Sequence, residues 1–317
     1  MAPKVLYHEI DKISAPGKNF LESRGYEMKL GRGIDISLIK EDIADCDAVI
    51  VRFGTINEEV MLAAKNLKVI AKHGVGVERI DLDAARRLGI RVVNAPSGNT
   101  ISVVEQTIML ILCCAKRLPE IQRLCKASDE KAISNFKSRE VYGKTLGLIG
   151  CGNIGSKLAK AAVSALDMRV LAYDPFLKPE KAPDYITLTA DRDKVIREAD
   201  FLSLHLPINS QTRGSISNKE FAMMKNSAFL INAARGAIVD ELALIKALDS
   251  GEIAGAGLDC TMDEPPLPDN PLQKMENVVL TPHVSAYTIE ALERVCLHAA
   301  QGIDSVLSGK EPEWPVV

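Results

Sequence analysis

Three residues in the last third of the chain could act together on a substrate that carries a carboxylate. Arg235 follows an apolar segment, and a guanidinium can hold a carboxylate through two parallel hydrogen bonds. His283, in Leu280-Thr-Pro-His283, can exchange a proton near neutral pH. Glu264 could orient that imidazole and favour its protonated form. These residue types together predict a site that binds a carboxylate and moves a proton.

Each of these residues also has a plainer interpretation when it is taken alone. Arg235 could be a surface side chain beside a turn glycine, and His283 an exposed or structural loop residue. The acidic loop around Glu264 could simply be solvated. The functional interpretation is favoured because each residue follows a predicted strand, and open parallel sheets place ligands at the carboxyl ends of their strands.

The motif Gly150-Cys-Gly152-Asn153-Ile154-Gly155 is typical of a dinucleotide-binding turn. It follows a predicted strand over Thr145–Ile149 and precedes a predicted helix over Ser156–Leu166. The first glycine would allow the tight turn, the second the approach of a pyrophosphate, and the third the close packing of helix on strand. The helix N-terminus would then offer its N–H groups to the phosphates.

An acidic residue follows at the spacing that this motif requires. Asp174 lies nineteen residues beyond Gly155, where such folds place an acid that accepts hydrogen bonds from the adenosine ribose. A carboxylate there would repel a 2′-phosphate, and Pro175 and Phe176 supply no cation. The sequence therefore favours NAD over NADP. The remaining alternative is a tight turn in an α/β fold that does not bind this ligand.

The two sets of residues complement each other chemically. A nicotinamide cofactor supplies hydride chemistry, while Arg235, His283 and Glu264 would supply a carboxylate clamp and a proton. Reduction of a 2-keto acid to a 2-hydroxy acid needs these parts. We therefore expect such a reaction at the carboxyl edge of a parallel sheet.

Short apolar segments alternate with helix-period segments, which is typical of βαβ units and a parallel sheet. In the first third of the chain, helices are predicted over Asn57–Lys65 and Asp83–Leu88, and an apolar helix over 101–118 is expected to end at Pro119. The strands predicted there are Lys4–His8, Ala48–Arg52, Val69–His73 and Arg91–Asn94.

A second series of strands and helices begins at Lys144. It includes an amphipathic helix over Asp240–Leu248 that Gly251 is expected to close. The fold class is therefore predicted to be α/β, with two doubly wound parallel sheets of Rossmann-like or flavodoxin-like type. The strands predicted in this series are Thr145–Ile149, Arg169–Tyr173, Phe201–Leu206, Ala228–Asn232, Ala254–Leu258 and Val278–Leu280.

A last predicted helix, over Thr288–Leu307, follows the complete second series. One solution is that this helix crosses back and packs on the first series, which would make the first domain discontinuous. We therefore expect a substrate domain of residues 1–98 and 289–317, with a NAD-binding domain of residues 99–288 inserted into it.

The composition is that of a globular protein with about two domains. The 317 residues are 47% hydrophobic and 26% charged, and the net charge of −3 gives no global positive field for nucleic acid or an anionic membrane. The N-terminus lacks the pattern of a signal peptide, and the apolar stretch at 108–115 is too short to cross a bilayer. Seven cysteines without a CxxC pair predict buried, reduced thiols, no metal site and a cytoplasmic location.

Taken in order, the motifs resemble those of the D-isomer-specific 2-hydroxyacid dehydrogenases, and the match covers most of the chain. The order and spacing of the matching segments make the resemblance specific. These segments are Gly143-Lys-Thr-Leu-Gly-Leu-Ile-Gly-Cys-Gly-Asn-Ile-Gly155, His205-Leu-Pro207, Asn232-Ala-Ala-Arg-Gly-Ala-Ile-Val-Asp240, Gly257-Leu-Asp-Cys-Thr-Met-Asp-Glu-Pro265 and Thr281-Pro-His283.

The resemblance implies a role for each matching residue. Arg235 would bind the substrate carboxylate, and His283 would be the acid/base with Glu264 as its partner. Asp259 would hold the nicotinamide carboxamide, with Ala233-Ala234 along the nicotinamide ribose. The residues implied in NAD binding are Gly150, Gly152, Asn153, Ile154, Gly155, Asp174, Pro175, His205, Leu206, Pro207, Ala233, Ala234, Arg235, Asp259 and His283.

The first domain is also similar to the family. The segment Lys72–Asp81 resembles its substrate loop, in which N–H groups around two glycines hold the carboxylate. Val49-Ile-Val-Arg52 and Asn94-Ala-Pro-Ser-Gly-Asn99 resemble the 3-phosphoglycerate dehydrogenase branch most. Two residues depart from the resemblance: Phe53 replaces the small polar residue usual after that arginine, and Tyr287 stands where the family often has a small residue. The residues implied in substrate binding are Arg52, Lys72, Gly74, Val75, Gly76, Asn99, Arg235 and His283, of which Arg52, Lys72 and Asn99 match positions at the phosphate end.

The resemblance implies an NAD-dependent oxidoreductase that acts on the CH–OH group of a small, anionic D-2-hydroxy acid, as a homodimer built on the NAD-binding domain. The acid could be 3-phosphoglycerate, or the keto/hydroxy partner of glyoxylate, hydroxypyruvate or lactate. One alternative on the same scaffold is a formate or phosphite dehydrogenase, although Glu264 beside His283 favours a hydroxy acid. The other is an NAD-sensing binding protein similar to the C-terminal-binding corepressors.

Overall fold

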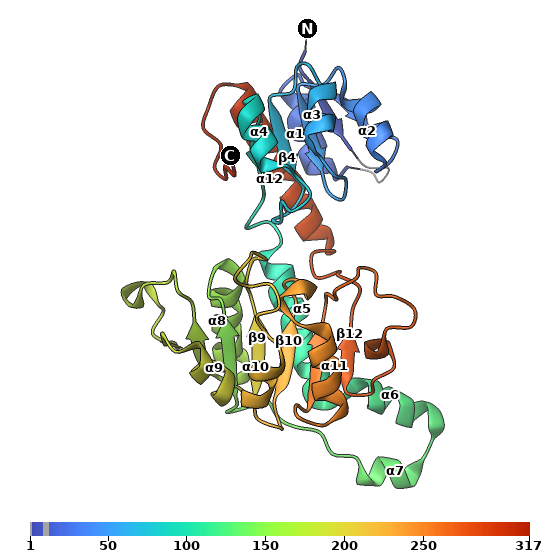
Figure 1. The fold of residues 1–317 in the computed structure, drawn as a ribbon, viewed down its shortest axis with the longest axis vertical. Helices are drawn as coiled ribbons and strands as arrows, with labels where there is room; N and C mark the ends of the chain where they lie inside the picture. The colour runs from blue at the N-terminus through green and yellow to red at the C-terminus, as the bar shows by residue number, and fades with distance from the viewer. Residues whose placement is uncertain (1, 9–12) are drawn as a thin grey trace. The chain divides into compact units, whose positions relative to one another are not determined.

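A computed structural model describes residues 2–8 and 13–317 of the chain. The chain divides into two compact units: unit 1 comprises Met1–Thr100 and Tyr287–Val317, and unit 2 comprises Ile101–Ala286. Each unit contains a parallel β-sheet with helices beside it (Figure 1). The predicted α/β class with two parallel sheets is therefore confirmed.

The sheet of unit 1 has the strand order β2-β1-β3-β4-β5, which is the flavodoxin-like order. Its central strands are short runs of β-branched and apolar residues, such as the Ala-Val-Ile-Val of β3, and they are buried on both faces as parallel strands are. The strands are β1 (Lys4–Tyr7), β2 (Glu27–Leu30), β3 (Ala48–Val51), β4 (Val69–Lys72) and β5 (Arg91–Val93). The helices are α1 (Ala15–Ser23), α2 (Ile36–Ile43), α3 (Glu58–Ala63), α4 (Leu82–Leu88) and α12 (Ile289–Leu307).

The last helix, α12, belongs to unit 1 and packs on its sheet. Its apolar face is buried in one core with residues of β1, β3, β4 and β5. A Cβ at Gly17 of α1 would lie 2.4 Å from the sulfur of Cys296, so glycine is what allows α1 and α12 to pack this closely. The first and last parts of the chain therefore share one hydrophobic core.

The sheet of unit 2 has the strand order β12-β11-β10-β9-β6-β7-β8. The order reverses between β6 and β9, which is the switch point where open α/β sheets bind ligands. The strands are β6 (Thr145–Ile149), β7 (Arg169–Tyr173), β8 (Ile186–Leu188), β9 (Phe201–Leu204), β10 (Phe229–Asn232), β11 (Gly255–Leu258) and β12 (Val278–Leu280). The helices are α5 (Thr100–Lys116), α6 (Leu118–Ala127), α7 (Glu130–Asn135), α8 (Asn153–Leu166), α9 (Arg192–Glu198), α10 (Asn218–Met223) and α11 (Glu241–Asp249).

The region after α5 differs from the prediction. Pro119 was expected to end helical structure, but it lies in the first turn of α6, where a missing N–H leaves no hydrogen bond unmade. In Figure 1, α6 and the following α7 extend away from the sheet of unit 2. Several apolar side chains of this arm are exposed, among them Ile121 and Ile133.

The cysteines only partly fit the expectation of buried thiols. All seven are free, and five are buried, but Cys125 is exposed and Cys113 is half-buried. The prediction was therefore wrong for Cys125. Among the described residues, none of the helices combines the length and the apolar character that crossing a bilayer requires.

Candidate functional site

The predicted cofactor and catalytic residues of unit 2 all follow the carboxyl ends of parallel strands. Because parallel strands end at the same edge of a sheet, the loops that carry these residues lie along one edge. The glycine motif follows β6, Asp174 and Pro175 follow β7, His205, Leu206 and Pro207 follow β9, Ala233, Ala234 and Arg235 follow β10, Asp259 and Glu264 follow β11, and His283 follows β12.

The glycine motif is packed so tightly that side chains are excluded at two of its positions. Gly150 has a φ of +96°, and a Cβ there would lie 2.3 Å from the carbonyl oxygen of His205. A Cβ at Gly155 would lie 2.4 Å from the carbonyl oxygen of Gly150. At Gly152, by contrast, a Cβ would meet no atom within 4 Å. The turn is therefore closed on its inner side and open at the glycine that would face a pyrophosphate.

The start of α8 fits an anionic group. Its N-cap residue is Gly152, which has no side chain to cap the first turn, so the N–H groups there are available to a ligand. Asp174 accepts a hydrogen bond from the Cys151 N–H at 2.8 Å and another from the Phe176 N–H at 2.8 Å. This carboxylate therefore holds the glycine turn to the end of β7, at the edge where a ribose would lie. These residues fit a dinucleotide.

His205 lies beneath this turn as a neutral residue. Burial lowers its pKa to about 4, and its Nε2 is 2.9 Å from the hydroxyl of Ser203. The backbone of His205 is the surface against which Gly150 packs. Its main chain and its bond to Ser203 therefore help to build the turn that would hold the cofactor.

Arg235 is held by a short loop that a buried amide organises. The Nδ2 of Asn232 donates to the carbonyl oxygen of Arg235 at 2.9 Å, and its Oδ1 accepts from the Ala234 N–H at 3.0 Å. Asn232 is only 1% exposed, so both bonds replace bonds to water. The half-buried guanidinium of Arg235 also donates to the Ala234 carbonyl oxygen at 2.8 Å.

Gly236 brings the Arg235 loop against the loop that carries Glu264. A Cβ at Gly236 would lie 1.9 Å from the carbonyl oxygen of Thr261, so only glycine allows this approach. The second loop is also anchored by Glu241, which accepts a hydrogen bond from the Met262 N–H at 2.9 Å. The close packing of the two loops therefore explains why a glycine follows Arg235.

Asp259 holds the loop of His283. Its buried carboxylate accepts hydrogen bonds from the Thr281 hydroxyl at 2.6 Å, the Val284 N–H at 3.0 Å and the Ser285 N–H at 2.9 Å. Gln106 donates to the same hydroxyl at 3.0 Å. Asp259 therefore fixes the backbone on both sides of His283.

His283 and Glu264 form the pair that the sequence predicts. The Nδ1 of His283 lies 2.7 Å from Oε2 of Glu264, and both side chains are a little more than one-third exposed. His283 has a φ of +54°, a left-handed conformation that is uncommon for a residue with a side chain. The bond at Nδ1 leaves Nε2 as the ring nitrogen that can meet a substrate.

The predicted substrate residues of the first domain lie in unit 1, whereas Arg235, Glu264 and His283 lie in unit 2. Lys72 ends β4, the strand beside β3, and its ammonium group donates to the carbonyl oxygen of Arg52.

The backbone holds the glycine loop of unit 1. Gly74 has a φ of +140° and accepts a hydrogen bond from the Ala95 N–H at 2.8 Å, while Asn94 donates to the Val75 carbonyl oxygen at 2.9 Å. The segments that contain Gly74–Gly76 and Asn94–Asn99 are therefore joined, and Asn99 is half-buried at the end of the second one.

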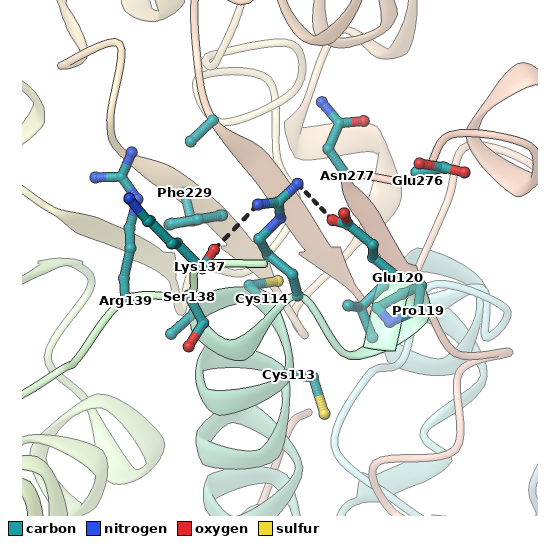
Figure 2. A pocket seen from close by; sticks show the side chains of 14 residues that line it. Cys113, Cys114, Pro119, Glu120, Lys137, Ser138, Arg139, Phe229, Glu276 and Asn277 are labelled. Atoms are coloured by element: carbon teal, nitrogen blue, oxygen red, sulfur yellow. Dashed lines mark hydrogen bonds and ion pairs between the residues drawn. The ribbon is translucent and has the colours of Figure 1, made fainter. Parts of the chain in front are cut away.

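The large cavity of unit 2 lies elsewhere. It measures about 620 Å³ and is lined by residues at the amino ends of β10, β11 and β12 and in the region of α6. Phe229, Asn277, Glu120 and Lys137 are among the lining residues that Figure 2 labels. The cavity is therefore at the opposite edge of the sheet from the predicted catalytic residues.

Sequence reasoning did not assign functions to several residues that build the site. Asn232, Thr281 and Gln106 act through hydrogen bonds to the loops of Arg235 and His283. The only signal for Asn232 was its position at the end of a buried apolar strand, where an unpaired amide would be costly. Gln106 is far from its partners in the sequence and gave no signal.

Comparison with known proteins identifies the family. Residues 108–285 match the sequence profile described as the D-isomer-specific 2-hydroxyacid dehydrogenase NAD-binding domain. The chain belongs to this family. Its glycine turn, Asp174 and the loops after β9, β10, β11 and β12 are all within the matched NAD-binding domain.

Individual members of the family match along nearly the whole chain. D-3-phosphoglycerate dehydrogenase of Archaeoglobus fulgidus is 41% identical over 96% of this chain, but the match spans only 58% of that enzyme. A Staphylococcus saprophyticus protein assigned to the 2-hydroxyacid dehydrogenases is 38% identical, over 96% of this chain and 97% of its own length. The crystal structure of D-lactate dehydrogenase with NAD⁺ from Lactobacillus jensenii has a TM-score of 0.82, at 32% identity over 99% of both chains.

Proposed function

We propose that the protein is an NAD-dependent dehydrogenase that interconverts a small, anionic 2-keto acid and the D-2-hydroxy acid. The observation that carries the proposal is the 2.7 Å contact between His283 and Glu264, on a loop that Asp259 fixes from both sides. This pair is suited to exchange a proton with a substrate. In this proposal, residues 99–288 form the NAD-binding domain, and residues 1–98 and 289–317 form the substrate domain.

The glycine motif, Asp174 and Pro175, His205-Leu206-Pro207 and Ala233-Ala234 would hold the cofactor. When bound, NAD supplies or accepts a hydride at its nicotinamide ring. The carboxylate of Asp174 favours a free 2′-hydroxyl over a 2′-phosphate, so NAD rather than NADP is the proposed cofactor.

Arg235 would bind the substrate carboxylate through two parallel hydrogen bonds and polarise the neighbouring keto oxygen. Nε2 of His283 would give its proton to that oxygen during reduction and take the hydroxyl proton during oxidation. Glu264 accepts from Nδ1 and so sets which ring nitrogen faces the substrate. The carboxamide role implied for Asp259 stays a prediction, since four donors already surround its carboxylate.

The N–H groups around Gly74–Gly76, together with Arg52, Lys72 and Asn99, are the substrate-binding groups that we propose in unit 1. Lys72 ends β4 and Arg52 directly follows β3, its parallel neighbour, which places two cations at one edge of the sheet. Two cations favour a substrate with a second anionic group, as in the 3-phosphoglycerate-like branch of the family.

We further propose a homodimer built on unit 2, in a reducing cytoplasm that suits seven free thiols. The arm of α6 and α7 carries exposed apolar side chains at Leu118, Ile121 and Ile133, which an isolated helix pair would leave in water. Replacing Ile121 and Ile133 by Glu should convert a dimer, measured by sedimentation, into a monomer. A wild-type chain that sediments as a monomer would contradict this part of the proposal.

A turnover assay tests the main proposal. The purified chain is given NADH with glyoxylate, hydroxypyruvate, pyruvate, phosphohydroxypyruvate or sulfopyruvate, and loss of the NADH absorbance is followed. At least one acid should be reduced, and His283→Gln should lower kcat by about 10²–10⁴-fold while NADH still binds in a fluorescence titration. A wild-type chain that binds NADH but reduces none of the five acids would instead support an NAD-sensing binding protein.

A further inference from the structure

The guanidinium of Arg52 lies against two aromatic rings. Its Cζ is 4.6 Å from the ring centre of Phe53 and 4.5 Å from that of Tyr287. All three residues belong to unit 1, although more than 230 residues separate Arg52 from Tyr287 in the sequence. Both rings are partly in solvent, with Phe53 41% and Tyr287 46% exposed.

The rings are the partners that the structure gives this guanidinium. Within residues 2–8 and 13–317, no hydrogen bond and no ion pair involves the side chain of Arg52. Its positive charge is therefore not neutralised by an acidic side chain in the described part of the chain. The charge of Arg52 also acts on His73. Burial is the main cause that lowers the pKa of His73 to about 4, and the positive charge of Arg52 is the second.

An aromatic contact differs from an ion pair in what it leaves available. A ring attracts the face of a guanidinium, whose five N–H donors point outward in its own plane. Two rings can thus restrict the side chain without using those donors. An oxyanion such as a phosphate or a sulfonate accepts two of them at once, in a fixed geometry.

We propose that Phe53 and Tyr287 are positioning residues that hold Arg52 ready for the second anionic group of the substrate, and so determine specificity for phosphorylated or sulfonated 2-keto acids over small ones. The proposal rests on the proposed dehydrogenase function. A flexible arginine would lose conformational entropy when the oxyanion binds, whereas a restrained one has already lost it. The effect should therefore fall on substrate binding, and only for substrates that carry the second anion.

The test compares KM and kcat for phosphohydroxypyruvate, sulfopyruvate and glyoxylate in the wild type and in Tyr287→Ala, Phe53→Ser and the double variant. Each single change should raise KM for the preferred oxyanion substrate about threefold, and the double change about tenfold. KM for glyoxylate and kcat for all three acids should stay within about twofold. Tyr287→Phe keeps the ring and should restore the wild-type KM. Arg52→Ala shows the loss expected when the charge itself is removed.

Each outcome supports or overturns the proposal. The two oxyanion substrates distinguish a phosphate from a sulfonate. The substrate whose KM rises in the variants is the one whose second anionic group binds Arg52. Equal KM changes for glyoxylate, or a Tyr287→Phe variant as impaired as Tyr287→Ala, would overturn the aromatic role. So would a wild type that reduces only the small acids, although the dehydrogenase proposal would then stand. A wild type that reduces no acid would overturn both. Thermal melting of each variant shows whether a change in KM comes from misfolding.

Discussion

The edges of the two units at which we propose the cofactor and the substrate to bind are held in different ways. In unit 2, buried polar groups hold the loops by hydrogen bonds: Asn232 fixes the loop of Arg235, and Asp259 fixes the loop of His283. Gly236 allows the Arg235 loop to contact the loop that carries Glu264. In unit 1, the cation of Arg52 is placed by two half-exposed rings. A chemical step needs atoms within a fraction of an ångström, which bonds between buried groups provide.

The looser arrangement in unit 1 suits a different task. Choosing among acids that differ at their far end depends on side chains that can be exchanged without disturbing the backbone. Phe53 and Tyr287 are such side chains, since neither is buried in the core. The comparison suggests that changes at the unit 2 edge abolish the reaction, whereas changes at the unit 1 edge alter which acid is preferred.

The largest effect is expected from Gly236→Ala. The new Cβ would overlap the carbonyl oxygen of Thr261, only 1.9 Å away, and would push the Arg235 and Glu264 loops apart. A displacement of about 1 Å can cost about 10²-fold in rate, and overpacking about 1–3 kcal/mol in stability. Both kcat/KM and the melting temperature should fall.

Gly33→Ala serves as the control for that change, because the nearest atom to its new Cβ is the flexible end of Leu38 at 3.1 Å. It should melt near the wild-type temperature and keep full activity. Should Gly236→Ala keep its activity as well, the two loops would not need their close contact, and the contrast between the units would lose its main support.

Asp259→Asn should have the next largest effect. An amide cannot accept from all the donors that surround this carboxylate, because its NH₂ group would face N–H groups of the His283 loop. We expect kcat to fall about 10–100-fold with a smaller change in NADH binding. Steady-state kinetics and a fluorescence titration would check this, with Thr281→Val as a milder change of the same network.

Strands that form a continuous apolar run could be predicted from sequence, even β12 at the edge of its sheet, whereas the edge strands β2 and β8 could not. The bounds of β6, β7 and β12 were predicted to the residue, because a short apolar run between polar turns is typical of a buried strand. The edge strands β2 and β8 are short and partly exposed, so their patterns resemble loops. Helix starts were predicted one residue early at Asp240 and Thr288, since both are N-caps just outside their helices.

The same limit applies to the site. Arg235, Glu264 and His283 could be proposed as catalytic residues because each follows a strand and has a side chain suited to the chemistry. The network that positions them could not, because Gln106 and Thr281 meet only after the chain has folded. The contact of Arg52 with Tyr287 was hidden for the same reason, although both residues could be singled out individually.

Acid pH provides a further comparison, because each unit contains a histidine with a strongly lowered pKa, and unit 1 also buries His8, whose pKa burial lowers as well. Burial lowers the pKa of His73 in unit 1 and of His205 in unit 2 to about 4, from an ordinary 6.5. Below pH 6.5 these two imidazoles therefore bind protons in the unfolded chain, whereas in the folded chain they stay neutral until the pH approaches about 4. Stability is full above pH 6.5 and falls as the pH drops through this window.

Urea unfolding at pH 7 and pH 5 would measure the loss, which should be about 1–2 kcal/mol for His73. His73→Gln and His205→Gln should each reduce the difference between the two pH values. Arg52→Ala should reduce it slightly in the same direction, because the charge of Arg52 disfavours protonation of His73. An unchanged pH difference in both glutamine variants would assign the acid sensitivity to other groups.

The smallest effects are expected from two helix caps, one in each unit. Thr288 caps α12 by accepting from the Ala291 N–H at 3.1 Å, and Asp191 caps α9 by accepting from the Lys194 N–H at 2.9 Å. Replacing either by Ala should cost about 1 kcal/mol of stability. Only Thr288 adjoins Tyr287, so only Thr288→Ala should also raise KM for an oxyanion substrate, by about twofold. Equal KM values in the two cap variants would mean that the ring on Arg52 does not depend on how α12 begins.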